Sequence, residues 1–405
     1  MADTEKNEKV VSGEFQEINS DDLNNEPEAI NSANNSGDNR EAIKIITSSG
    51  HSHHHSSRGG KRSKRHRRKN KKVLKRVLII VGILLLLAAA IAACGFAVLY
   101  NSGKNELKHD AVKIEAPEKV ESVDDGKYVY YKGGKYKFNP DIMNLLFIGI
   151  DENNGNETDG IGNNGQSDVL AIAAINSEKS KVTIINIPRD IMTDVKVFSP
   201  SGGYSGTEKM QIALSFAYGD GGDTSCVNTM AAVRSLFYNI PISSYFALKM
   251  EGVPELNDSI GGVDVKSTET IRIFEKGEKY HLEGSDALLF VRARDMYTVD
   301  ANLKRNLRQR VYLNAFIKKF VNKTKGDIGV PISVFNATKP FSFTNLNANK
   351  ITYLATEFIL NKDMKIEMKS IPVTVEKKGE NAANYVKEDE FYEMFLDTFY
   401  DKVDK

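Results

Sequence analysis

Cysteine, histidine and tryptophan are scarce in this sequence. The 405 residues include no tryptophan and two cysteines, Cys94 and Cys226. Two cysteines give no disulfide framework, and Cys94 lies in an apolar segment, so the cysteine count says little about the redox compartment. The histidines lie almost entirely in the N-terminal part, with His281 alone in the globular part, and no Ser/His/Asp arrangement is visible. The sequence therefore gives no sign of a hydrolase that depends on a catalytic triad.

The N-terminal part has almost no aromatic residues, and its acidic and basic residues lie in separate segments. Residues 1–50 hold eleven acidic against four basic residues, whereas residues 58–76 hold twelve basic residues and no acid. A polar segment of this kind buries too little apolar surface to offset the entropy lost on ordering. We expect residues 1–72 to be a disordered tail that ends in a polybasic run. The histidines at 51 and 53–55 are typical of a low-complexity tract, although a metal cluster is the alternative.

Charge is then absent from residues 77–100. At about 1.5 Å per residue, 24 helical residues span about 36 Å, which is enough to cross a hydrocarbon core of about 30 Å. Basic residues on the N-terminal flank favour a cytoplasmic N-terminus and suit anionic lipid head groups. The sequence predicts a single-pass protein of the cell membrane, with everything after Tyr100 outside the cell.

A lipid-modified form is the alternative to this uncleaved anchor. The sequence Ile91-Ala-Ala-Cys94 resembles a lipobox, whose cysteine is acylated after cleavage. A signal peptide normally begins with a short basic region, but here 76 residues precede the apolar segment. The uncleaved helix is therefore the preferred interpretation.

The part after the apolar segment predicts one α/β domain. Residues 101–140 are expected to form an extracellular stalk that ends in a β-hairpin, in which Gly133-Gly134 joins strands at 128–131 and 135–138. From residue 141 to 405 strand-like and helix-like patterns alternate. Strands are predicted at 144–150, 169–176, 181–188, 245–250, 287–292 and 365–373. Helices are predicted at 224–237, 301–323 and 387–402, with a mixed segment at 351–360.

Charged residues follow or precede several of these strands. The run Thr183-Ile-Ile-Asn-Ile-Pro-Arg-Asp190 stops at a proline, which cannot donate to a β-ladder, and then presents Arg189 and Asp190. Asp151 follows one apolar run and Asp168 precedes another. Ligands bind at the carboxyl edge of open α/β sheets. Two acids and a set of arginines at such edges suggest a metal and a phosphate, and solvated loop charges are the alternative for any one of them.

The motifs of this chain, taken together, resemble those of the LytR-CpsA-Psr (LCP) family of cell-envelope proteins. The resemblance covers about residues 144–319. It rests on Asn144-Leu-Leu-Phe-Ile-Gly-Ile-Asp151, Ser167-Asp168, Ile187-Pro-Arg-Asp190, Phe216-Ala-Tyr-Gly219, Asp258-Ser-Ile-Gly-Gly-Val-Asp264, His281-Leu-Glu-Gly-Ser-Asp-Ala-Leu-Leu-Phe-Val-Arg-Ala-Arg294 and Arg305-Asn-Leu-Arg-Gln309. Several motifs in one order make this a specific signal.

The resemblance implies a fold and an activity. The family fold is a three-layer α/β sandwich with a hydrophobic pocket for a lipid tail and with magnesium and arginines at its mouth. Family members transfer a teichoic acid-like or capsule-like glycopolymer from a polyprenyl-pyrophosphate carrier to a peptidoglycan hydroxyl. The implied partners are this lipid-linked glycopolymer, peptidoglycan and the membrane, without nucleic acid.

The resemblance also implies roles for particular residues. Magnesium takes one or two carboxylates, waters and phosphate oxygens, and Asp151 and Asp168 match its ligands. Guanidinium groups pair bidentately with phosphate. Pyrophosphate contacts are expected from Arg189, Arg292, Arg294, Arg308, Gln166 and Lys209. Arg189 and Asp190 are the catalytic candidates, where Asp190 either deprotonates the acceptor hydroxyl or holds Arg189 in place. Arg305 fits a solvated helix face as well as it fits the site.

Two departures from the family pattern keep other functions open. The chain has Gln166 where the family usually has arginine, and Gln211-Ile-Ala213 where it usually has Lys-Ile-Asn, with Lys209 two residues earlier. A divergent enzyme is the first interpretation. A non-enzymatic pyrophosphate-lipid sensor, scaffold or transcriptional attenuator is the second. A nucleic-acid-binding regulator that uses residues 58–76 is the third, and the adjacent apolar span argues against it.

Overall fold

The computed structural model describes residues 64–107, 113–151, 160–295, 301–361, 363–378 and 381–403. The chain divides into two compact units, Met1–Ala89 and Ala90–Lys405. The tail before residue 64, which the sequence predicts to be disordered, and the histidine tract within it lie outside the described residues.

Helix α1 spans Lys64–Leu107 and includes the predicted apolar segment. Within it, Ile79–Leu107 is long and apolar enough to cross a membrane, and its apolar side chains are largely exposed. The helix continues past the predicted end of the span, so residues 101–107 are helical where the sequence suggested a stalk.

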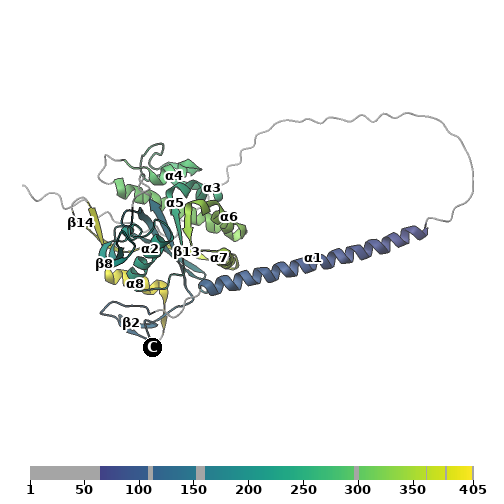
Figure 1. Cartoon of the computed structure of the whole chain (residues 1–405), viewed down its shortest axis with the longest axis horizontal. Coiled ribbons are helices and arrows are strands. Elements are labelled where there is room, and N and C mark those ends of the chain that lie inside the picture. Colours follow the sequence, from purple (N-terminus) through teal and green to yellow (C-terminus); the bar gives the residue numbers. More distant parts are fainter. Residues whose placement is uncertain are drawn as a thin grey trace, which may run out of the picture. The chain divides into compact units, whose positions relative to one another are not determined.

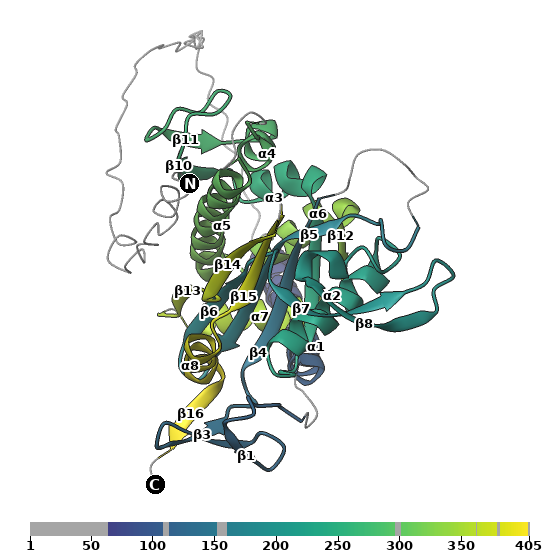
Figure 2. The same cartoon turned by 90° about the vertical axis from the view of Figure 1, so that its left-hand side faces the viewer.

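A six-stranded sheet forms the centre of the second unit (Figure 2). Its strand order is β12 (Ser342–Thr344), β9 (Ser244–Lys249), β4 (Met143–Asp151), β5 (Gln166–Asn176), β6 (Lys181–Ile187) and β13 (Lys365–Ser370). Strands β4 and β9 are parallel, as are β6 and β13, while β5 is antiparallel to both of its neighbours. The carboxyl ends of β4, β6, β9 and β13 therefore meet the start of β5 at one edge of the sheet.

Helices cover both faces of this sheet, which gives the predicted three-layer α/β architecture (Figures 1 and 2). On one face, Leu146 and Ile172 pack in a core with α2 (Asp223–Leu236) and α8 (Glu388–Phe399). On the other face, Ala171 and Ile184 pack near α5 (Ala301–Gly326) and α7 (Ala348–Leu360). Successive strand residues point to opposite faces, so a strand that is apolar on both sides fits between two helical layers.

Smaller elements surround these layers. The predicted hairpin is present as β2 (Tyr128–Tyr131) and β3 (Gly134–Phe138), flanked by β1 (Glu121–Val123) and β16 (Tyr400–Val403). Three further hairpins are β7 (Met192–Phe198) with β8 (Tyr204–Gln211), β10 (Val263–Lys266) with β11 (Lys279–Leu282), and β14 (Val373–Lys378) with β15 (Asn381–Val386). The remaining helices are α3 (Val253–Ser259), α4 (Ser285–Arg292) and α6 (Gly329–Thr338), with 3-10 turns at Ile212–Ser215, Met250–Gly252 and Lys339–Phe341.

One predicted strand is wrong, because residues 287–292 form part of helix α4. The helix follows Gly284, whose φ of 48° and ψ of −126° suit glycine alone, and it buries Ala287, Phe290 and Val291. This spacing of three and four residues is helical, and a five-residue apolar run is too short to show it unaided. The other differences are smaller: Pro372 separates β13 from β14, residues 351–360 are helical, and the last helix gives way to β16.

Candidate functional site

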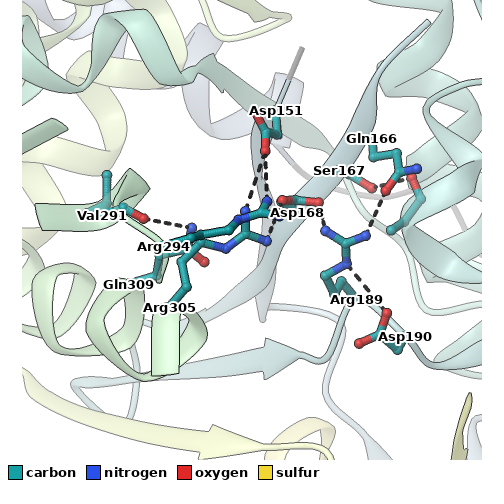
Figure 3. A network of polar contacts seen from close by, with 11 residues as sticks. Asp151, Gln166, Ser167, Asp168, Arg189, Asp190, Val291, Arg294, Arg305 and Gln309 are labelled. Carbon is teal, nitrogen blue, oxygen red and sulfur yellow. Dashed lines mark hydrogen bonds and ion pairs between the residues drawn. The ribbon is translucent and has the colours of Figure 1, made fainter. Parts of the chain in front are cut away.

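The paired ends of β4 and β5 bring two carboxylates together. Asp151 is the last residue of β4 and lies opposite Gln166 at the start of β5. The ladder is irregular between Gly149 and Ile150, so the register shifts by one residue here. Such a bulge redirects side chains, and Asp168 reaches the same edge as Asp151 although it lies two positions into β5. Figure 3 shows both carboxylates turned toward Arg305.

Arg189 enters this edge from the loop that follows Pro188. Its guanidinium forms an ion pair with Asp168 and donates a hydrogen bond from Nη2 to Oε1 of Gln166 at 2.7 Å. Its Nε lies 3.4 Å from Oδ1 of Asp190 (Figure 3). Gln166 thus supplies an acceptor for Arg189. The predicted grouping of these four residues at the carboxyl edge is present.

Arg305 is the central cation of the cluster, a position that the sequence left undecided. It lies on α5 with 2% of its side chain exposed. Its Nη2 donates to Oδ2 of Asp168 at 2.9 Å, and its Nη1 lies 3.5 Å from Oδ2 of Asp151. Arg294 adds a second cation, with Nη2 3.5 Å from the same Asp151 oxygen.

The missed signal is the buried face of α5. Leu307 and Val311 are only half-buried, and the buried positions in the turns around them are Arg305, Arg308, Gln309 and Tyr312. Those positions follow helical spacing, so they form one face. The Arg305-Asn-Leu-Arg-Gln309 motif was therefore the available sign that polar residues of α5 point inward.

Burial and like charge raise the pKa of the Asp151 carboxyl. The largest cause is burial, the next is repulsion from Asp168, and Arg294 opposes both. Burial also raises the pKa of Asp190, although Arg189 favours its charged form. The cluster thus contains carboxylates that a further nearby cation would stabilise in their ionised form.

Asp151 and Asp168 fit a magnesium ion by chemistry. Magnesium is held by one or two carboxylates and completes its shell with waters and phosphate oxygens. Among the described residues, no group of three or more His, Cys, Asp or Glu side chains is arranged to hold a metal. A site built on two carboxylates needs no such group.

Three further predicted residues lie at different distances from the cluster. Arg292 is near enough to act on the charge of Asp151. Arg308 instead forms an ion pair with Glu269 and donates from Nε to the carbonyl of Phe290 at 2.8 Å, and burial lowers its pKa to about 10. This arrangement ties α5 to α4.

Lys209 lies on β8, exposed and opposite Asp194 of β7 in the hairpin ladder. In the described part of the chain, no interaction joins Lys209 or Arg308 to the Asp151 cluster. The pyrophosphate contacts assigned to these two residues stay predictions.

An apolar surface adjoins the charged cluster on the same face of the sheet. Phe147, Gly149 and Asp151 alternate along β4 and so point to one side. Phe147 is 37% exposed, although β4 is an inner strand, and its ring packs edge-on against Phe246 of β9. A cavity of ≈ 140 Å³ lies at the opposite end of β4, beside Met143 and Glu357, and is not part of this site.

The family of the chain follows from its sequence match. A model of the LytR_cpsA_psr family matches residues 97–398. The chain belongs to this family. The match includes every residue of the cluster, so the LytR-CpsA-Psr motifs and the site coincide.

Curated LytR-CpsA-Psr relatives carry the name polyisoprenyl-teichoic acid–peptidoglycan teichoic acid transferase TagU. The protein of that name from Bacillus anthracis (strain CDC 684 / NRRL 3495) is 31% identical over 181 residues, which are 44% of this chain and 52% of the relative. The one from Oceanobacillus iheyensis is 29% identical over 227 residues, which are 54% of this chain and 63% of the relative. The chain thus spans about half to two thirds of the length of these relatives.

Solved structures of similar proteins include B. subtilis TagV. It is 24% identical, covers 64% of this chain and 95% of its own length, and superposes with a TM-score of 0.46. The protein gbs0355 from Streptococcus agalactiae is 17% identical, covers 65% of this chain and 91% of its own length, and gives a TM-score of 0.49.

Proposed function

We propose that this protein is a membrane-anchored phosphotransferase of the cell envelope. It moves a teichoic acid-like or capsule-like glycopolymer from a polyprenyl-pyrophosphate carrier to a peptidoglycan hydroxyl. The transferase names of its relatives support a glycopolymer donor and a peptidoglycan acceptor. The apolar helix Ile79–Leu107 supports the anchor.

The observation that carries this proposal is the junction of two kinds of surface. Asp151, Asp168, Arg189, Arg294 and Arg305 converge at the end of β4. The partly exposed ring of Phe147 lies on the same face of that strand. A polyprenyl pyrophosphate has the same two parts, because its head is anionic and its tail is apolar. Arginine forks suit the head, and exposed aromatic surface suits the tail.

The chain's own residues account for the proposed chemistry. The acceptor hydroxyl attacks the phosphorus that carries the glycopolymer, a new P–O bond forms, and the P–O bond to the polyprenyl phosphate breaks. Asp190, whose raised pKa makes it a better base, takes the hydroxyl proton. Arg189 and Arg294 hold the phosphoryl oxygens as their charge rises. Magnesium, when bound by Asp151 and Asp168, would supply further stabilisation of that charge.

A pyrophosphate-lipid binder without transferase activity is the second candidate. Gln166 and Gln211 replace two basic residues of the family pattern, which leaves fewer cations for the phosphates. A site that lacks them retains enough charge to bind the head group. It loses part of the stabilisation that is needed only in the transition state.

Replacement of both metal-binding candidates separates the two functions. Asp151→Asn with Asp168→Asn removes two negative charges and keeps the side-chain shapes. We expect this variant to retain the lipid and to lose glycopolymer transfer to a peptidoglycan acceptor in vitro. Asp194→Asn, an exposed change on β7, is the matched control and should leave transfer intact.

The wild-type protein decides between enzyme and binder in the same assay. Lipid binding without transfer, across several donors and with magnesium present, would favour the binder. Transfer by the double variant at the wild-type rate would show that these carboxylates do not hold a catalytic metal.

A further inference from the structure

The end of α1 is packed along α7 in antiparallel orientation. Oε1 of Glu106 accepts a hydrogen bond from Nδ2 of Asn349 at 2.8 Å, near the start of α7. Two turns earlier in α1, the Tyr100 hydroxyl donates to Glu357 at 2.8 Å, near the end of α7. These two bonds fix the register, because α1 residues of lower number lie beside α7 residues of higher number.

Gly103 permits this close packing. A Cβ atom at this position would lie 2.1 Å from the backbone oxygen of Asn349 and 3.0 Å from Cβ of Tyr353. A larger residue would force the two helices apart. The rings of Tyr100 and Tyr353 complete the seam, with their centroids 5.0 Å apart. Residues 100–107 are therefore attached to the domain.

The register predicts which part of the domain lies level with the apolar span. Phe96 precedes Tyr100 by about 6 Å of helix, and Leu360 follows Glu357 by about 4.5 Å in the same direction. Leu360 therefore lies roughly level with Phe96, inside the charge-free segment 77–100. Leu360 is 68% exposed and ends α7. If the charge-free segment crosses the bilayer, a side chain at this level lies at the boundary between lipid and water.

We propose that the C-terminal end of α7, led by Leu360, inserts into the outer surface of the bilayer that α1 crosses. The α1–α7 seam holds the domain against that surface. This inference rests on the proposed membrane anchor and adds a second point of lipid contact. The described residues that follow Leu360 include Asp363 and Lys365, whose opposite charges give no net attraction to the head groups, so insertion is driven by apolar burial. Side chains at this boundary enter the bilayer by about 5–10 Å.

Depth-dependent quenching in the full chain tests the proposal. Leu360→Cys is made in a chain with Cys94→Ser, while Cys226 is buried and stays unlabelled. The cysteine carries an environment-sensitive fluorophore, and the protein is placed in phosphatidylethanolamine/phosphatidylglycerol vesicles that contain doxyl-labelled phospholipid. Leu87→Cys, in the apolar helix, is the positive control. Tyr204→Cys, an exposed site on β8, is the negative control.

We expect strong quenching at positions 87 and 360 and none at 204. Quenching at 87 without quenching at 360 would overturn the proposal and leave the anchor standing. Absence of quenching at 87 would overturn the anchor and this inference together.

A change in the seam tests what holds Leu360 in place. Gly103→Leu should abolish most quenching at position 360 while that at 87 remains. Gly95→Leu is the matched control, since a Cβ atom there has no atom within 4 Å, and it should retain quenching at 360. Retained quenching in the Gly103→Leu chain would overturn the role of the seam.

Discussion

Removal of the Arg305 charge should destabilise the folded domain by a measurable amount. Arg305 and Asp168 are each 2% exposed and joined at 2.9 Å, so they form a buried ion pair. Loss of one partner from such a pair costs about 3–5 kcal/mol, because the other charge stays buried without compensation. Arg189 still contacts Asp168, which places Arg305→Met toward the lower end of that range. The free energy of unfolding of a typical domain is about 5–15 kcal/mol, so the expected loss is a large fraction of it.

Urea unfolding of the full chain in detergent, followed by circular dichroism, measures this change. Lys323→Met, at an exposed position on the same helix, is the control and should stay within about 0.5 kcal/mol of the wild type. Asp168→Asn added to Arg305→Met should restore part of the loss, since it removes a buried charge that Arg189 alone compensates. An Arg305→Met chain with wild-type stability would refute the ion-pair argument.

Three further predictions concern the site and the topology. Arg189→Ala should weaken binding of a short polyprenyl pyrophosphate roughly tenfold or more in a titration, because a charge-assisted hydrogen bond contributes about 1.5–3 kcal/mol; unchanged affinity in a folded variant would remove Arg189 from the site. Folding raises the pKa of Asp190, so the folded chain binds a proton at this carboxyl more tightly than the unfolded chain does. The protonated carboxyl therefore contributes to stability at low pH, and this contribution falls as pH rises from about 4 through the pKa that Asp190 has in the folded chain. Asp190→Asn should therefore flatten the fall in unfolding free energy between pH 4 and 7, and an unchanged pH profile would contradict this. Protease added to intact protoplasts should cleave the domain near Lys132 and leave residues 1–70 protected, and the reverse pattern would invert the topology.

The sheet and one half of the site could be predicted from the sequence. Runs such as residues 181–188 are apolar on both faces and end at proline, which determines both the strand and its edge. Asp151, Asp168 and Arg189 each lie within two residues of such an edge. Strands that share a sheet bring their edges together, so the meeting of these three side chains follows from strand pattern alone.

The other half of the site depends on tertiary packing that the sequence conceals. Helix α5 carries basic residues at several positions, and its apolar Leu307 and Val311, four residues apart, are only half-buried. The inward face in its first turns instead holds Arg305 and Arg308, because their charges are matched by Asp168 and Glu269. Local patterns fail at such positions because the site needs residues that a core would exclude. The position of Arg294, just after the end of α4, could not be predicted for another reason. The apolar run before it is short, and such a run does not distinguish a helix from a strand.

The pairing of acids with arginines at one edge has a consequence for the proposed reaction. In the cluster, Arg189, Arg294 and Arg305 compensate Asp151, Asp168 and Asp190, so the charges nearly cancel. A magnesium pyrophosphate carries both signs as well. Its metal would bind the carboxylates, and its phosphate oxygens would pair with the guanidinium groups that are now paired with those carboxylates. Each group would exchange one partner of opposite charge for another, so neither the acids nor the arginines would be left uncompensated as the substrate binds. In the proposed reaction, this exchange would account for a site with as many carboxylates as arginines, whereas a site for a bare phosphate would need the arginines alone.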